Sequence, residues 1–242
     1  LVWLDASEGA LHALCAAGSL LSLLLVAGIA PVASLAGCWA LYLSLATVGQ
    51  AFLWFQWDGL LLETGFLALF LAPWRWQSRP GSDPPPSRLA LAMLRWLLFR
   101  LMLSSAVAKL ASGDASWRDL TALQYDYETQ CLPPWTAWHM HHLPAWFHHL
   151  SAALMFVVEG LVPFLIVAPR RIRFAAGAAV VGLQVLIWLT GNYGFFNLLA
   201  GALCLLLLDD GVWPWRWRAA REARMAAALA GKLASAGTGA GA

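Results

Sequence analysis

Charged residues are scarce in this chain. Only 12% of its 242 residues are Asp, Glu, Lys or Arg and 61% are hydrophobic, whereas soluble domains carry roughly 25% charged residues. Continuous apolar runs of about 20 residues recur, without the alternation that is typical of a membrane β-barrel. The net charge of +2 is small, and no basic cluster favours nucleic acid as a partner. The composition predicts an all-α integral membrane protein with membrane lipid around it.

Metal-ligand patterns are also lacking. The cysteines have no metal-ligand spacing, and three of them lie in apolar runs, so we predict no disulfide framework; they are Cys15, Cys38, Cys131 and Cys204. The histidine cluster lacks the (i, i+4) pair with a flanking acid that helical zinc motifs have; its members are His139, His141, His142, His148 and His149. We therefore expect no metal and no cofactor.

The apolar runs predict a polytopic helical bundle of about seven spans, in a membrane domain of residues 1–210. The expected spans are residues 11–29, 32–52, 60–72, 89–110, 146–168, 174–190 and 195–208. The third is short, and a re-entrant segment is the alternative for it. Residues 211–242 form a basic tail with a helical pattern, expected on the membrane surface, and their end is expected to be disordered. Because the first residue is Leu1, we expect further helices before it.

One polar segment interrupts this pattern. We predict a polar extramembrane loop over residues 111–145, between the fourth and fifth spans, with a helix end at Gly113 followed by an N-cap and a short surface helix. Arginines gather at 75–88, 170–173 and 216–224, which seven alternating spans place on one side. The positive-inside rule makes that side cytoplasmic. The polar loop would then face the lumen or periplasm.

Ionisable residues lie in or beside the predicted spans, where a charge costs about 3 kcal/mol or more. Asp58 is expected as a solvated cap at the interface. Arg100 lies near mid-depth, and we predict that it pairs with Glu63 or Glu159. Pro163 lacks the N–H that would bond the carbonyl of residue 159. It therefore predicts either a polar pocket at Glu159 or a simple kink.

Lys109 ends the fourth span beside the polar loop. Helical geometry places it on the same face as Ser105. Desolvation lowers the pKa of a lysine and makes it a usable base. The alternative is an interfacial lysine that pairs with Asp114 or Asp119, and the residues alone leave both roles open.

Three strings carry a resemblance to a known family. They are FQWDGLLLETGFLALFLAP, the segment from RWLLFRLMLSSAVAKLASGDASWRDLTALQYDYETQ to APRRIR, and LTGNYGFFNLLAGALCLLLLDD. Over about residues 50–210 the chain resembles the lipase maturation factor family, although that family leads us to expect His at Asp126 and Pro at Cys131. The resemblance implies an integral membrane protein, in the endoplasmic reticulum of animals, that assists folding and dimer assembly of secreted lipases. We expect the family's larger C-terminal soluble region to be absent here. In the family that region is lumenal, which conflicts with the cytoplasmic tail predicted above.

The resemblance implies a non-enzymatic maturation factor with a lipase or similar client protein. The predicted client surface comprises Trp117, Arg118, Asp119, Tyr125, Glu128, Thr129, Gln130, Asn192, Tyr193 and Asn197. The bias towards Ala, Arg and Leu is typical of a GC-rich bacterium, in which the membrane would be the plasma membrane.

A more distant likeness supports an alternative function. The segment LSSAVAKLASGDASW is similar to a helix-end motif of vitamin K-dependent γ-glutamyl carboxylases, in which the lysine matching Lys109 acts as the base on the quinol. The alternative is therefore a membrane enzyme that acts on a quinone or lipid-like substrate. Lys109 would be its general base, and Glu63, Arg100 or Glu159 would shape the pocket.

Overall fold

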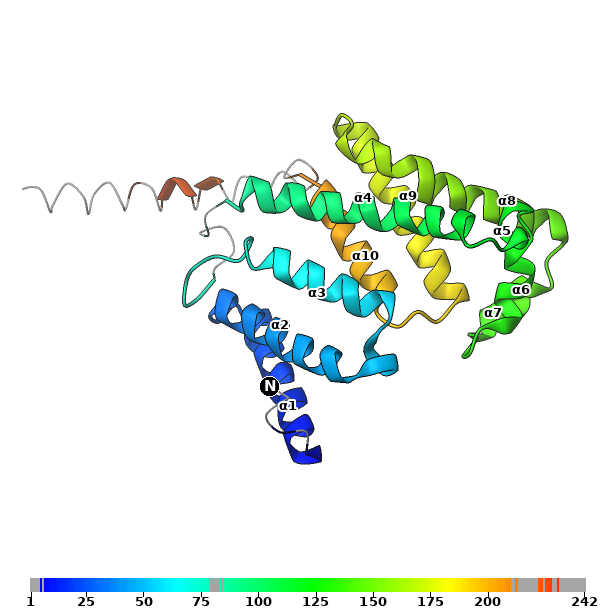
Figure 1. Ribbon diagram of the computed structural model, residues 1–242. Coiled ribbons are helices and arrows are strands. Elements are labelled where there is room, and N and C mark those ends of the chain that lie inside the picture. Colours follow the sequence, from blue (N-terminus) through cyan, green and yellow to red (C-terminus); the bar gives the residue numbers. More distant parts are fainter. Residues whose placement is uncertain are drawn as a thin grey trace, which may run out of the picture. The chain divides into compact units, whose positions relative to one another are not determined.

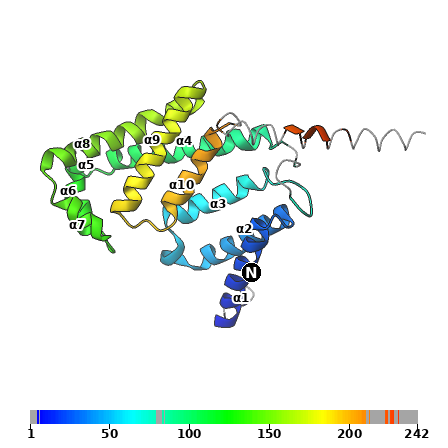
Figure 2. The same cartoon turned by 180° about the vertical axis from the view of Figure 1, so that it is seen from behind.

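The chain divides into two compact units in the computed structural model (Figures 1 and 2). Unit 1 comprises Leu1–Leu91 with Asp209–Ala242, and unit 2 comprises Ala92–Leu208. The structure describes residues 5, 7–78, 83, 85–209, 212, 222, 223, 225–227 and 230. Within these residues the regular elements are helical, apart from an isolated bridge between Ile29 and Gln77. The predicted all-α class is confirmed, whereas most of the predicted basic tail lies outside the described residues.

The described helices of unit 1 come first in the chain. They are α1 (Glu8–Val26), α2 (Pro31–Val48), the 3₁₀ turn η1 (Gln50–Leu53) and α3 (Gln56–Ala68). Helix α1 packs against α2, and α2 packs against α3 (Figure 1). A Cβ atom added at Gly37 would lie 2.6 Å from Cδ1 of Leu21. Glycine therefore lets α1 and α2 approach closely, as small residues do between membrane helices.

Unit 2 holds most of α4 and the helices that follow it. They are α4 (Arg88–Ala111), α5 (Ala115–Arg118), α6 (Ala122–Thr129), α7 (Trp135–His141), α8 (Ala145–Phe156), the π-helical turn η2 (Val157–Leu161), the 3₁₀ segment η3 (Val162–Val167), α9 (Arg170–Thr190), α10 (Phe196–Cys204) and the 3₁₀ turn η4 (Leu205–Leu207). Gly113 has φ +79° after the end of α4, and Asp114 caps α5 by accepting from the Ser116 N–H at 2.9 Å. The predicted helix end, N-cap and short helix are thus present.

Five described helices are long and apolar enough to cross a membrane. They are Glu8–Val26, Pro31–Val48, Arg88–Ala111, Ala145–Val167 and Arg170–Thr190. Helix α3 has 13 residues, about 20 Å at 1.5 Å per residue, whereas a bilayer core is about 30 Å thick. The apolar helix Phe196–Leu207 is shorter still. The prediction of seven spans is therefore not confirmed, and the sidedness derived from it stays a prediction.

Two arginines close one end of unit 2. Arg95 donates from Nε and Nη2 to the carbonyl of Leu206 at 3.0 and 2.8 Å. Arg173 donates from Nε to the carbonyl of Leu207 at 2.9 Å. These carbonyls lie in the last turn of η4, where helical hydrogen bonds run out. The two guanidinium groups therefore tie α4 and α9 to the end of α10 and η4.

Candidate functional site

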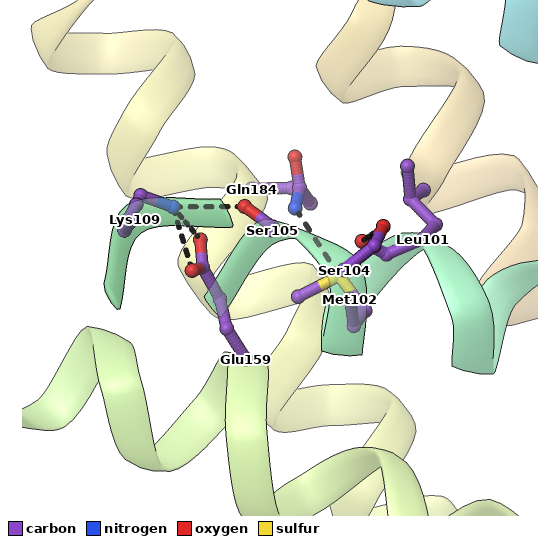
Figure 3. Close-up of polar contacts among 7 residues, drawn as sticks. All are labelled: Leu101, Met102, Ser104, Ser105, Lys109, Glu159 and Gln184. Atoms are coloured by element: carbon purple, nitrogen blue, oxygen red, sulfur yellow. Dashed lines mark hydrogen bonds and ion pairs between the residues drawn. The ribbon is translucent and has the colours of Figure 1, made fainter. Parts of the chain in front are cut away.

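An ion pair between the half-buried Lys109 and the buried Glu159 joins α4 to the π-helical turn η2. Nζ of Lys109 donates to the two carboxylate oxygens of Glu159 at 2.8 and 2.6 Å, and to Oγ of Ser105 at 2.8 Å. Glu159 is only 3% exposed. Figure 3 shows its carboxylate pointing across to the ammonium group of Lys109. Each charge is thus paired and hydrogen-bonded, which buried charges require.

Local helix geometry explains this arrangement. Ser105 and Lys109 are four residues apart, so they share one face of α4. Glu159 lies in η2, and η3 follows with Pro163 near its start. Because proline cannot donate to the carbonyl four residues earlier, the hydrogen-bond pattern changes from α-helical to π-helical and then to 3₁₀. The proline therefore accompanies a change of helix type that presents Glu159 to Lys109.

The first part of the polar loop covers this pair. Nζ of Lys109 lies 5.6 Å from the centroid of the Trp117 ring. The Trp117 ring in turn meets the Phe156 ring edge-on, with centroids 6.2 Å apart. A cation over an indole face is attracted by the ring quadrupole. Trp117 therefore links α5 both to the ion pair and to α8.

A second polar group lies where α6 meets the end of α9. Nε2 of Gln130 donates to Oδ2 of Asp126 at 3.3 Å and to the carbonyl of Thr190 at 3.1 Å. Burial raises the pKa of Asp126, while the hydrogen bond from Gln130 and the charge of Lys109 act in the opposite direction. Burial, followed by the charge of Asp126, raises the pKa of Tyr193 to about 12. The charge of Lys109 thus acts on Asp126 in α6, and the charge of Asp126 acts on Tyr193 in the 191–195 turn.

Helix α7 is tied to the same end of α9. Oγ1 of Thr136 donates to the carbonyl of Leu189. Nδ1 of His141 lies 3.1 Å from the carbonyl of Gln124 in α6. The polar loop is thus held by contacts with the spans and within itself, rather than extending freely from them.

The predicted client surface divides by exposure. Its exposed members are Arg118, Asp119, Tyr125, Glu128, Thr129 and Asn192, and its half-buried members are Trp117, Gln130 and Tyr193. Asn197 is only 4% exposed, so its prediction as a surface residue is wrong. It lies on the face of α10 that also buries Ala200 and Cys204.

The predictions for the charged residues need two corrections. Asp58 is a cap, but a buried one rather than a solvated one: it is 3% exposed and accepts from the Phe55 N–H at 2.9 Å. Lys109 pairs with Glu159, not with Asp114 or Asp119. The predicted pairing of Arg100 with Glu63 or Glu159 stays a prediction.

One predicted ion pair joins residues of different units. Glu63 lies in unit 1 and Arg100 in unit 2, so their predicted ion pair stays a prediction.

Two polar residues in apolar runs escaped the sequence analysis. The hydroxyl of Tyr42 donates to Oδ1 of Asp58 at 2.5 Å. Gln184 is buried, and its Nε2 lies 3.9 Å from Sδ of Met102, one turn before Ser105 on α4 (Figure 3). A single Tyr in WALYLSLATV and a single Gln in VVGLQVLIWL could have indicated these contacts, because a polar group in a span needs a partner.

Sequence comparisons identify similar proteins. The family described as "Lipase maturation factor transmembrane domain" matches residues 1–215. The chain is 54% identical to Lipase maturation factor 2 of Homo sapiens over 181 residues, which is 71% of this chain and 26% of the relative. It is 46% identical to Lipase maturation factor 2 of Gallus gallus over 220 residues, 88% of this chain and 31% of the relative.

A second type of relative is also similar. The chain is 40% identical to Lipase maturation factor 1 of Mus musculus over 189 residues, 78% of this chain and 33% of the relative. The chain thus spans between about a quarter and a third of the length of these relatives. No solved structure matches it. The likeness to γ-glutamyl carboxylases stays a prediction.

Proposed function

The chain belongs to the lipase maturation factor family, and we propose that this membrane domain assists the folding and dimer assembly of a secreted lipase. The names of its relatives carry the lipase maturation role, and the proposal extends that role to this chain. The membrane would be that of the endoplasmic reticulum in a eukaryote and the plasma membrane in a bacterium. The polar loop would face the lumen or the periplasm, where a secreted lipase folds.

The observation that carries the proposal is an exposed polar surface on two short helices that are held in place by contacts with the spans. We call Arg118, Asp119, Tyr125, Glu128 and Thr129 the α5–α6 surface; each is exposed. Beneath it, the same two helices are fastened to the spans by the Trp117 contact with Lys109 and by the bond from Gln130 to α9. A surface that is ordered before binding loses less conformational entropy when a partner docks.

The chemistry of the α5–α6 surface suits a partner that is bound and then released. It carries both signs of charge beside an exposed tyrosine, and Tyr and Arg are enriched at protein interfaces. Polar interfaces are typical of transient rather than obligate contacts. A maturation factor must release each folded client, so we assign client contact to this surface.

The enzyme alternative is less well supported. The ammonium group of Lys109 directs its N–H bonds at the two oxygens of Glu159 and at Ser105. In this arrangement Lys109 is a hydrogen-bond donor, whereas a general base must accept a proton. The ion pair therefore favours a structural role for Lys109.

Deletion and complementation test the proposed function. Removing the protein should lower the yield of active secreted lipase, and lipase should co-purify with the restored full chain. The double variant Tyr125→Ala/Glu128→Ala should reduce co-purified lipase about tenfold, because a few interface residues carry most of the binding free energy. Trp74→Ala, which changes an exposed aromatic in unit 1, is the matched control and should leave the yield unchanged. Normal lipase yield in the deletion strain would overturn the proposal.

A further inference from the structure

The outward face of α7 is aromatic. Trp135, Trp138, His139 and His142 follow the spacing i, i+3, i+4, i+7, which places them on one helical face; we call them the aromatic stripe. All four are exposed, with Trp135 at 78% and Trp138 at 62%. The Trp138 ring lies 5.0 Å from the His139 ring and 4.2 Å from the His142 ring, between centroids. The opposite face buries Ala137 completely, so α7 packs on one face and exposes its aromatic stripe on the other.

The position of α7 follows from the length of α9. Helix α9 has 21 residues, about 31 Å at 1.5 Å per residue, which matches a hydrocarbon core of about 30 Å. If α9 spans the bilayer, each of its ends must therefore lie near one membrane surface. Leu189, next to the last residue of α9, accepts the hydrogen bond from Thr136 of α7. Helix α7 is thus fastened at the level where the hydrocarbon ends.

The next candidate span points to the same level from the other side of α7. The candidate span Ala145–Val167 begins only a few residues after α7 ends at His141. Trp146, in the first turn of that span, is also exposed. Helix α7 is therefore hydrogen-bonded to the end of α9 and joined by a short connection to the start of the candidate span Ala145–Val167.

The composition of this stretch distinguishes a lipid from a protein partner. Residues 131–147 contain no Asp, Glu, Lys or Arg, whereas the α5–α6 surface carries both signs of charge. Indole rings, with an apolar body and a polar N–H, concentrate at the boundary between headgroups and acyl chains. A short helix with exposed tryptophans at that level therefore favours insertion into this boundary.

We propose that α7 is an interfacial helix, and that its aromatic stripe inserts into the headgroup–acyl boundary of the bilayer that holds α8 and α9. Lipid is then the partner of this face, and the inserted stripe holds the polar loop against the membrane. The proposal requires no lipase, so it stands or falls independently of the proposed client.

Depth measurements on labelled protein test this placement. The full chain, with its four cysteines replaced by alanine, is reconstituted in phosphatidylcholine nanodiscs. A nitroxide is attached at Trp138→Cys or at His142→Cys, and at Tyr125→Cys of α6 as the matched control. Collision rates with oxygen, which prefers lipid, and with a nickel chelate, which stays in water, are read by electron paramagnetic resonance. The ratio of oxygen to nickel collisions should be about fivefold higher at 138 and 142 than at 125, because an interfacial helix is buried roughly 5–10 Å into the boundary.

Three results would overturn the proposal. The first is nickel accessibility at 138 and 142 equal to that at 125. The second is spin–spin broadening in nanodiscs that hold two chains, which would make a second copy the partner. The third is protection that appears only after a lipase is added, which would make the stripe a client site. If Trp138→Cys lowers the helical circular dichroism, the exposed His142 position decides the outcome alone.

Discussion

Two buried carboxylates, one in each unit, are stabilised by different kinds of hydrogen-bond donor. Asp58 of unit 1 and Glu159 of unit 2 are each 3% exposed. Asp58 accepts from the hydroxyl of Tyr42 and from the N–H of Phe55, which are neutral donors. Glu159 accepts from the ammonium group of Lys109, 50 residues away in the chain.

The positions of the two acids in their helices explain the difference. Asp58 lies in the first turn of α3, where free N–H groups and the helix dipole already favour negative charge. Glu159 lies in a π-helical turn within the candidate span Ala145–Val167, far from any helix start. No dipole offsets its charge there, so it needs a cation. A carboxylate at a helix N-terminus can rely on local donors, whereas one inside a span depends on a distant segment.

The largest expected effect is the loss of one member of the ion pair. Glu159→Ala should destabilise the protein by about 3–5 kcal/mol, because it removes the carboxylate that the Lys109 ammonium group binds. Thermal unfolding of the purified protein in detergent, followed by circular dichroism, measures this change. Lys109→Met should have an effect of similar size, because it leaves the Glu159 carboxylate unpaired.

The double variant Lys109→Met/Glu159→Met is the control for this prediction. Removing both charges should recover most of the lost stability, since apolar pairs often replace buried ion pairs at little cost. If the double variant is as unstable as the sum of the single variants, the two residues are not coupled and the pairing is wrong.

A smaller effect is expected at Asp58. Tyr42→Phe removes one neutral donor and leaves the bond from the Phe55 N–H, so we expect a loss of about 1.5–3 kcal/mol, the range for hydrogen bonds to charged groups. The same unfolding assay measures it. In an Asp58→Asn background the effect of Tyr42→Phe should shrink, because the acceptor is no longer charged. A loss at Tyr42 equal to that at Glu159 would remove the distinction between the two sites.

The smallest effect concerns Asp126, a carboxylate outside the spans. Burial raises its pKa in the folded protein, so the folded state binds its proton more tightly than the unfolded state does. Its contribution to stability is therefore fully present below the unfolded pKa of about 3.9, and it is lost as pH rises through the raised folded value. Asp126→Asn should therefore reduce the decrease in the free energy of unfolding as pH rises through the raised folded pKa.

Unfolding at a series of pH values from 4 to 7 measures the Asp126 effect. Asp114→Asn is a suitable control, because a backbone hydrogen bond from Ser116 lowers the pKa of Asp114. Its contribution to stability has the opposite sign: it is present above the unfolded pKa and lost as pH falls. A variant of Asp126 with an unchanged pH profile would contradict the raised pKa.

Much of the fold could be predicted from hydropathy. The five long helices lie where continuous apolar runs predict them, because a run of about 20 apolar residues has few alternatives to a span. The third and seventh predicted spans are short in the structure, with α3 at 13 residues. Apolar composition alone does not distinguish a full span from a shorter buried helix, since both exclude polar residues.

The candidate site was only partly predictable. The shared face of Ser105 and Lys109 follows from their spacing in one helix. The partner of Lys109 does not follow, because it depends on how η2 turns Glu159 and on how α8 packs beside α4. The burial of Asn197 was also missed, since a helix of nine residues offers several faces and only its neighbours decide which is covered.

The amino-acid sequence by itself determined the membrane class, the positions of the long helices, the family, and the identity of the few residues that can carry charge in a span. These are properties of local composition and spacing, which require no knowledge of neighbours. Only the tertiary structure decided that Lys109 binds Glu159, that Asp58 is buried beside Tyr42, and that α7 is fastened to the end of α9. Each of these contacts joins residues on different helices, and their geometry depends on packing rather than on periodicity.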